Sequence, residues 1–305
     1  MKMMQKKIRS LIYAGLGLIL CVLLCGGIGM TAQAAESKTY GDFTYEEGKD
    51  GITITKYTGN KKKVVIPDKI NGTEVISIGD SAFWDCRSLT SITIPEGVTS
   101  IGDFAFDLCL NLTSITLPNS LTCIGSYGFA TTDLTSIIIP ENVKSIGCEA
   151  FYNCSELKKV VLPEGITRIA SKTFANCRSL TSITIPDSVT SIGKGVFFNC
   201  PKLKSVVIPD SVIEIDVFKK GENESGYWWT VFNQNTTVIC NKNSAAYKYA
   251  KKNNIPVKLM PKPAKKGTIL TVPSKKIKVK VTSSSKKNPT VAVMKITNKK
   301  AKKLT

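Results

Sequence analysis

The sequence predicts a β-rich repeat solenoid of 22 or 23 residues per coil, with a parallel β-sheet and short helical turns. The decapeptide CRSLTSITIP begins at Cys86 and recurs unchanged at Cys177, and prolines end apolar runs at a nearly constant interval between and beyond the two copies. A unit this short cannot enclose a core alone, so neighbouring coils must bury its apolar residues. The prolines are Pro95, Pro118, Pro140, Pro163, Pro186 and Pro209.

Each repeat has the pattern L-x-x-I-x-I-P-x-x-V-x-x-I-G-x-x-x-F-x-x-C-x-x. Ile92 and Ile94 alternate with polar residues, as in a strand with one buried face. Pro95 ends this strand because it cannot donate a ladder hydrogen bond. Val98 and Ile101 begin a second short apolar element, and the glycine after it permits a tight bend.

Two positions of the repeat are expected to stack as columns inside the solenoid, which gives a core that is continuous in one dimension. The phenylalanine column is Phe83, Phe106, Phe129, Phe151, Phe174 and Phe197. The leucine column is Leu89, Leu112, Leu134, Leu157, Leu180 and Leu203.

The repeats resemble the BspA-like leucine-rich-repeat family of bacterial surface proteins, roughly over residues 52–260. Six units carry the paired residues of that family, as in Ala82-Phe83 and Asn199-Cys200. The resemblance implies a curved solenoid displayed outside the cell, with adhesion or ligand capture as the usual role, and it implies no particular ligand. Departures are local: Thr131 and Thr132 stand where the cysteine is expected, Ala170 replaces the glycine, and Val196 replaces the alanine.

The N-terminus has the three parts of a secretory signal peptide: a basic start, an apolar run over residues 11–30, and Ala32-Gln33-Ala34. We expect cleavage after Ala34, which predicts a secreted or surface-associated protein without a transmembrane helix in the mature chain. One alternative is an uncleaved anchor, because the apolar run is long enough to cross a bilayer. Another is a lipid anchor on Cys25, although Leu24 is a poor flanking residue for it.

The formal net charge of +19 is concentrated at the ends of the chain. Residues 251–305 contribute +17 and contain no acid, whereas residues 35–250 sum to −2. A basic patch would suggest nucleic acid. The solenoid has no basic excess, so nucleic-acid binding is not expected.

Five of the ten cysteines occupy one slot of the repeat and are expected to point inward in a ladder, about 5 Å apart. Side chains in a parallel ladder point the same way and rarely reach disulfide geometry. Thr131, taken to stand in the same slot, indicates that the slot does not require sulfur. We predict buried free thiols, with disulfides as the alternative, at Cys86, Cys109, Cys154, Cys177 and Cys200.

No catalytic, cofactor or metal site is predicted. The chain has no histidine, which excludes Ser-His-Asp and Cys-His nucleophiles and histidine-ligated metals. It has no phosphate-binding glycine motif, and acids such as Glu96 and Glu164 are dispersed over loops, whereas a glycosidase needs two convergent acids. We therefore expect a protein that is not an enzyme.

An insertion interrupts the repeat late in the array. The next phenylalanine that fits the column after Phe197 is Phe232, at a spacing of 35 residues instead of 23. Insertions in repeats form loops, often on the binding face, and aromatic residues are common anchors of interfaces. The candidate ligand-binding residues here are Tyr227, Trp228 and Trp229, with capping of the last coils as the alternative role.

Three further candidates, Trp84, Tyr152 and Phe198, share the position directly after the phenylalanine column. The same two roles, ligand binding and covering of the core, are open for them. The outward strand positions form rows of serine and threonine, which we interpret as strand stabilisation. A hydroxyl-rich binding face is the alternative.

The predicted organisation has five parts. These are a signal peptide (1–34), an N-terminal cap hairpin (35–66), the solenoid (67–240), a capping helix and strand (241–260), and a lysine-rich linker with the incomplete start of a second repeat unit (261–305). The last part is inferred because residues 291–305 follow the order of apolar, lysine and Thr-Asn/Gly positions at 52–65. We expect the chain to be a fragment of a longer array, with a purposeful basic tail as the alternative.

These observations predict a secreted or surface-displayed binding module of adhesin type, a monomer that recognises a protein or glycan of a host or of the cell envelope. A structural spacer that presents another domain is one alternative. Binding of anionic wall polymers through the lysine-rich tail is a second.

Overall fold

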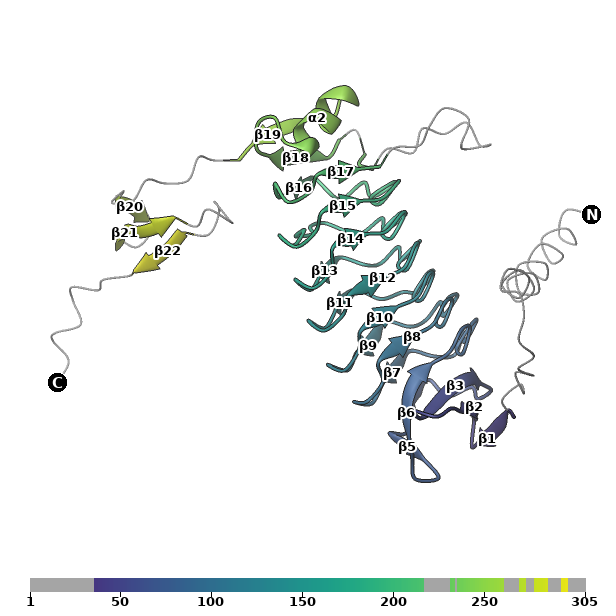
Figure 1. Ribbon diagram of the computed structural model, residues 1–305. Helices are drawn as coiled ribbons and strands as arrows, with labels where there is room; N and C mark the ends of the chain where they lie inside the picture. The colour runs from purple at the N-terminus through teal and green to yellow at the C-terminus, as the bar shows by residue number, and fades with distance from the viewer. Residues whose placement is uncertain are drawn as a thin grey trace, which may run out of the picture. The chain divides into compact units, whose positions relative to one another are not determined.

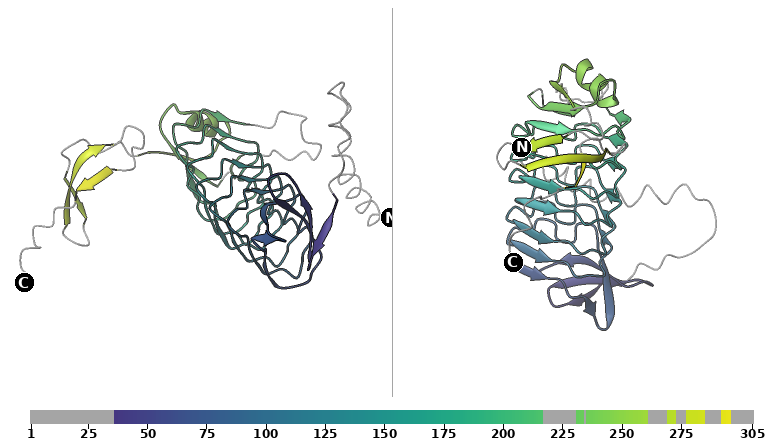
Figure 2. Two further views of the ribbon diagram at one scale, coloured as in Figure 1. Left: turned by 60° about the horizontal axis from the view of Figure 1, so that its bottom comes forward. Right: turned by 90° about the vertical axis from the view of Figure 1, so that its left-hand side faces the viewer.

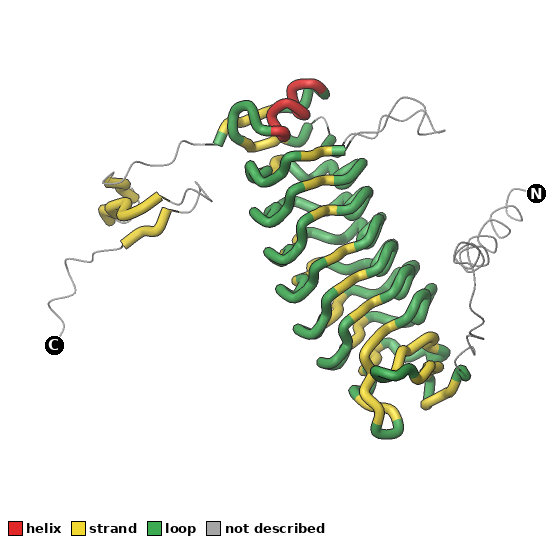
Figure 3. The backbone as a smooth tube through the Cα atoms, viewed as in Figure 1, coloured by secondary structure: helices red, strands yellow, loops and turns green. Residues whose placement is uncertain are grey.

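The structure is a computed structural model that describes residues 36–216, 231–233 and 235–260, and three strands between residues 269 and 295. The predicted signal peptide and Tyr227, Trp228 and Trp229 lie outside these residues. The repeats form a stack of coils in which each coil lies directly on the next (Figure 1). Most of each coil is loop, with a short strand on either side (Figure 3).

The first strand of each coil lies on one side of the stack, called the strand face below. Neighbouring strands are parallel and in register, with Ile92 opposite both Val64 and Ile115. The sheet is divided into pieces: residues 114–116 and 136–138 lack regular pairing with each other, and at the coil of Ser182 and Thr184 the pairing is reduced to isolated bridges. The strands are β4 (Lys63–Val65), β7 (Ser91–Thr93), β9 (Ser114–Thr116), β11 (Ser136–Ile138), β13 (Lys159–Val161), β16 (Ser205–Val207), β18 (Thr237–Cys240) and β19 (Val257–Leu259).

The second apolar element of each coil is also a short strand, on another side of the stack. The isoleucine that ends this strand is buried in each coil, except for the half-buried Ile215, and most of these isoleucines pair in register with the neighbouring coil, as with Ile101 and Ile124. The right-hand view of Figure 2 shows the strands of successive coils lying one above another. These strands are β6 (Thr73–Ile78), β8 (Ser100–Ile101), β10 (Cys123–Ile124), β12 (Ser145–Ile146), β14 (Arg168–Ile169), β15 (Ser191–Ile192) and β17 (Glu214–Ile215).

A turn around each column phenylalanine forms the third side, called the turn edge. In every turn the residues two before and two after the phenylalanine have positive φ, as at Ser81 (56°) and Asp85 (58°) around Phe83. The phenylalanine N–H then donates to the next coil, from Phe83 to the Ala105 carbonyl at 2.8 Å. Left-handed backbone costs about 1–2 kcal/mol per ordinary residue, and the ladder it permits satisfies the backbone groups of each turn. The turns span residues 81–85, 104–108, 127–131, 149–153, 172–176 and 195–199.

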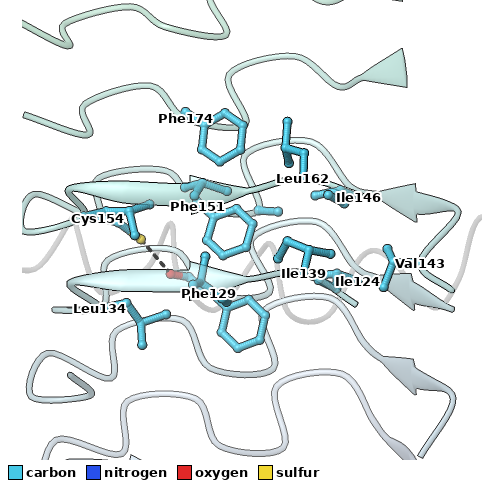
Figure 4. Packing of buried hydrophobic residues seen from close by; sticks show 14 of the residues in the cluster. Ile124, Phe129, Leu134, Ile139, Val143, Ile146, Phe151, Cys154, Leu162 and Phe174 are labelled. Carbon is cyan, nitrogen blue, oxygen red and sulfur yellow. Dashed lines mark hydrogen bonds between the residues drawn. The ribbon is translucent and has the colours of Figure 1, made fainter. Parts of the chain in front are cut away.

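The two predicted columns are confirmed as the core. Neighbouring phenylalanine rings stack with centroids 5.0 to 5.9 Å apart, and Phe232 continues the column after the insertion, 5.7 Å from Phe197. All phenylalanines and leucines of the two columns are buried. Figure 4 shows Phe129, Phe151 and Phe174 one above another. Full burial of such a side chain stabilises the fold by about 1.5–3 kcal/mol.

Four ladder cysteines are buried, and each thiol donates to the phenylalanine carbonyl of a preceding coil. The Cys154 Sγ lies 3.1 Å from the Phe129 carbonyl oxygen (Figure 4). The prediction that Thr131 occupies the cysteine slot is wrong: Thr132 does, and its hydroxyl donates to the same carbonyl at 2.9 Å. Cys86 is only half-buried, because it lies at the N-terminal end of the ladder. All eight cysteines of the described chain are present as free thiols.

Both ends of the solenoid are covered. At the N-terminal end β1 (Lys38–Tyr40), β2 (Phe43–Glu47) and β3 (Ile52–Tyr57) form an antiparallel meander. Strand β3 pairs in parallel with β6, and β5 (Lys69–Ile70) pairs with β6 in the antiparallel direction. At the other end α2 (Ala245–Lys252) begins after Ser244, whose side chain accepts from the Tyr247 N–H. The buried Tyr249 ring meets Phe232 edge-on, which closes the phenylalanine column.

The described residues of the tail form three strands: β20 (Ile269–Val272), β21 (Ile277–Ser284) and β22 (Ala292–Lys295). They form an antiparallel meander whose second pair has a register shift, as in β1, β2 and β3. The start of a second repeat unit stays a prediction. No helix among the described residues is long and apolar enough to span a membrane.

Candidate functional site

The turn edge brings one aromatic residue to the surface in each of four consecutive coils. Because the coils are in register, side chains at equivalent turn positions lie one strand spacing apart, about 5 Å. Trp84 and Tyr152, both predicted, follow the column phenylalanine; Trp84 is 46% exposed and Tyr152 is half-buried. Phe104 and Tyr127 occupy the two coils between them.

Phe104 and Tyr127 are the residues that sequence reasoning missed. Their rings are stacked with centroids 4.7 Å apart and planes inclined by 8°, and Phe104 is 39% exposed. Each lies two residues before its column phenylalanine, at positive φ. Their shared position, two residues before the phenylalanine in successive repeats, is the feature of the sequence from which they could have been identified. An aromatic residue in left-handed backbone is uncommon, and two in succession mark this stretch of the edge as specialised.

The third predicted residue, Phe198, lies on the same edge and is half-buried. Ala175 stands at its position one coil earlier, and Ala130 stands there one coil before Tyr152. The structure therefore places Trp84 and Tyr152 three coils apart on the turn edge, with the Phe104–Tyr127 pair in the two coils between them, and Phe198 two coils beyond Tyr152 along the same edge.

Asp107 lies at the Trp84 position of the next coil and has an unusual environment. Burial raises the pKa of the Asp107 carboxyl from its ordinary 3.8 to about 6. Hydrogen bonds from the Leu108 backbone and from the Trp84 and Thr131 side chains oppose this rise, while the charge of Asp85 adds to it. The charged form of the Asp107 carboxylate is thus poorly solvated.

Other acids on the turn edge have partners. Asp85 pairs with Arg87 at 2.7 Å, and Glu149 pairs with Lys172 at 3.3 Å. The Glu149 side chain also hydrogen-bonds with Tyr127, and burial followed by this contact raises the pKa of Tyr127 well above its usual value. Within the described residues, no lysine or arginine nitrogen lies within 4.0 Å of Asp107.

The strand face offers a second surface. Its outward positions include exposed apolar residues, among them Ile138 at 71% exposure, as well as the predicted hydroxyls. A hollow of about 340 Å³ lies where β13 loses its regular pairing. It is lined by Lys159, Val161, Leu162, Glu164 and Thr184, among others. No aromatic residue lines this hollow.

The described residues contain no group of three or more histidine, cysteine or acidic side chains that could hold a metal ion. The turn edge supplies aromatic faces, one desolvated carboxylate and an ordered backbone to hold them.

A family model described as "BspA type Leucine rich repeat region" matches the chain in six copies, over residues 56–177 and 122–223. A comparison with curated protein sequences found no significant match. Among solved structures, a leucine-rich repeat protein of T. pallidum is 32% identical, with 55% of this chain and 91% of that chain covered and a TM-score of 0.47. A leucine-rich repeat protein of Bacteroides ovatus is 19% identical, with 73% and 100% covered and a TM-score of 0.41.

Proposed function

Because this chain belongs to the BspA-type leucine-rich-repeat family, we propose that it is a secreted or surface-displayed binding module that recognises a macromolecule of a host or of the cell envelope. The turn edge is the recognition surface. The single observation that carries this assignment is the row of aromatic side chains at Trp84, Phe104, Tyr127 and Tyr152. The basic start, apolar run and Ala32-Gln33-Ala34 of the N-terminus support export.

The aromatic row suits recognition better than coverage of the core. The Phe column is already completely buried behind it, so the exposed parts of Trp84 and Phe104 contribute little to the core. Aromatic side chains supply large contact areas with few rotatable bonds, and tryptophan and tyrosine are enriched among residues that dominate binding energy. The backbone ladder of the turns fixes their positions before the ligand arrives, which lowers the ordering cost of binding.

The test is a binding survey with the purified full chain against immobilised extracellular-matrix proteins, mucin and wall polymers. The double variant Trp84→Ala/Phe104→Ala removes the two most exposed aromatic side chains of the edge. A matched double variant, Ile138→Ala/Val207→Ala, removes exposed apolar side chains from the strand face. We expect saturable binding that falls at least tenfold in the first variant, about 1.4 kcal/mol, and stays within twofold in the second.

Other outcomes separate the competing functions. Loss of binding in Tyr227→Ala/Trp228→Ala/Trp229→Ala alone moves the recognition surface to the insertion. Salt-sensitive binding to wall polymers that requires residues 261–305 supports the tail as the binding element. Absence of binding to every member of the panel supports the spacer.

A further inference from the structure

Asp107 carries a charge that its own protein does not neutralise. Its carboxylate is half-buried, whereas the nearby Asp85 and Glu149 carboxylates are paired with Arg87 and Lys172. A desolvated carboxylate without a cation destabilises the folded chain at neutral pH. Residues that lower the stability of the folded protein in this way are characteristic of binding sites.

The surroundings of Asp107 are those that attract an organic cation. Trp84 lies one coil before Asp107 at the equivalent turn position, directly after the column phenylalanine, and is 46% exposed. Tyr127 is close enough for the Asp107 charge to raise its pKa further, and Phe104 stacks on Tyr127. Aromatic faces attract cations through their quadrupole, and the attraction strengthens where water is displaced.

We propose that Trp84, Asp107 and the Phe104–Tyr127 pair bind an ammonium group carried by the macromolecular ligand, either a lysine side chain or an unacetylated amino sugar. This proposal rests on the function proposed above, because it names the chemistry recognised at the same edge. The ammonium contacts the open Asp107 oxygen and lies against the exposed aromatic rings.

Three other cation classes fit less well. The two-pronged guanidinium of arginine needs both oxygens of one carboxylate to be open, whereas the Asp107 side chain is half-buried. A calcium ion needs six to eight oxygen ligands, and the described residues hold no cluster of acids that could supply them. A quaternary ammonium has no N–H to donate to the carboxylate.

A neutral sugar is the main competing ligand. It could stack on Trp84 and donate hydroxyls to Asp107, but it would leave the carboxylate charge uncompensated. Acetylation of the amine distinguishes the two, because it removes the positive charge and keeps the rest of the ligand.

The experiment follows the indole N–H signal of Trp84 in the full chain labelled with ¹⁵N-tryptophan, assigned with Trp84→Phe. The probes are Nα-acetyl-lysine methylamide and methyl glucosaminide, each compared with its N-acetylated form. We expect the Trp84 signal to shift saturably with the ammonium probes and at least fivefold weaker affinity for the acetylated forms. Asp107→Asn should weaken ammonium binding at least fivefold, whereas Asp187→Asn, an exposed acid away from the turn edge, should not.

A shift with the lysine probe alone assigns a protein ligand, and a shift with the glucosaminide alone assigns an amino glycan; both outcomes support the ammonium site. Equal affinity for acetylated probes, unchanged binding in Asp107→Asn, or an unmoved Trp84 signal overturns it. Macromolecular binding that needs Trp84 but not Asp107 overturns the ammonium site and leaves the proposed function intact. Macromolecular binding that needs neither residue overturns both.

Discussion

Replacement of Asp107 by asparagine should make the protein more stable at neutral pH. Asparagine has the same shape and keeps an oxygen that accepts from Trp84 and Thr131, but it carries no charge to desolvate. Burial raises the pKa of the Asp107 carboxyl to about 6 in the folded chain, against about 3.9 for an unfolded aspartate. The folded state therefore disfavours the ionised form.

The sign and pH window follow from these two values. Below about pH 3 the carboxyl is protonated in both states, and up to about pH 4 the wild type and Asp107→Asn should differ little. As the pH rises to about 6, the unfolded chain ionises first and the wild type loses stability relative to the variant. Two pKa units correspond to about 2.7 kcal/mol, and partial exposure of the carboxyl reduces the expected difference to about 1 kcal/mol.

Urea denaturation of the two proteins at pH 4 and pH 7.5 measures the effect as a difference in midpoint. Asp85 and Tyr127 face the carboxyl, and both are retained in the variant, so their own titration affects the two proteins alike to first order. Asp187→Asn is the control, with an expected change within about 0.5 kcal/mol. A variant less stable than wild type at pH 7.5, or a difference independent of pH, would refute the reasoning.

Three further predictions concern the core. Phe151→Ala removes a fully buried ring stacked on both sides, at 5.5 and 5.6 Å, and should cost about 3–5 kcal/mol in urea denaturation; a loss below about 1.5 kcal/mol contradicts a close-packed column. Thr132→Val removes the hydrogen bond from the hydroxyl to the Phe129 carbonyl and should lower the free energy of unfolding by about 1–2 kcal/mol. Thr132→Cys restores the residue found at this position in most other coils and should retain most of the stability. An equal loss of stability in both variants would contradict the role of that bond. Burial raises the pKa of the Cys154 thiol to about 11 and that of the Cys200 thiol to about 12. The buried ladder thiols should therefore resist alkylation in the folded chain and react after denaturation without reductant. If fewer than half of them react, the ladder contains disulfides.

The columns of the core could be predicted because their positions recur at a nearly fixed spacing. In a solenoid, apolar residues at the same position of every coil stack inside the coils. Phe232 was identified as the continuation of the phenylalanine column although it follows Phe197 by 35 residues instead of 23. The assignment of Thr131 to the cysteine slot was wrong because this coil lacks a residue after the slot. Counting forward from Phe129 gives Thr132, in agreement with the hydrogen bond observed.

The turn edge was predicted only in part. Trp84, Tyr152 and Phe198 share one variable position, which made them visible in the sequence. Phe104 and Tyr127 occupy a different position, and nothing in their immediate sequence indicates exposure. The environment of Asp107 depends on groups from three coils, among them the Trp84 and Thr131 side chains and the Leu108 backbone. No single repeat contains that information, so only the stacked structure reveals it.

Site-specific photocrosslinking tests the central claim, that ligand binds the turn edge, most directly. A benzophenone amino acid placed at Phe104 reports on the turn edge, and the same group at Ile138 reports on the strand face, where the exposure is greater. With a ligand identified by the binding survey, irradiation should give a crosslinked product from position 104 and none from position 138. Crosslinking from position 138 alone would contradict the account and assign recognition to the strand face.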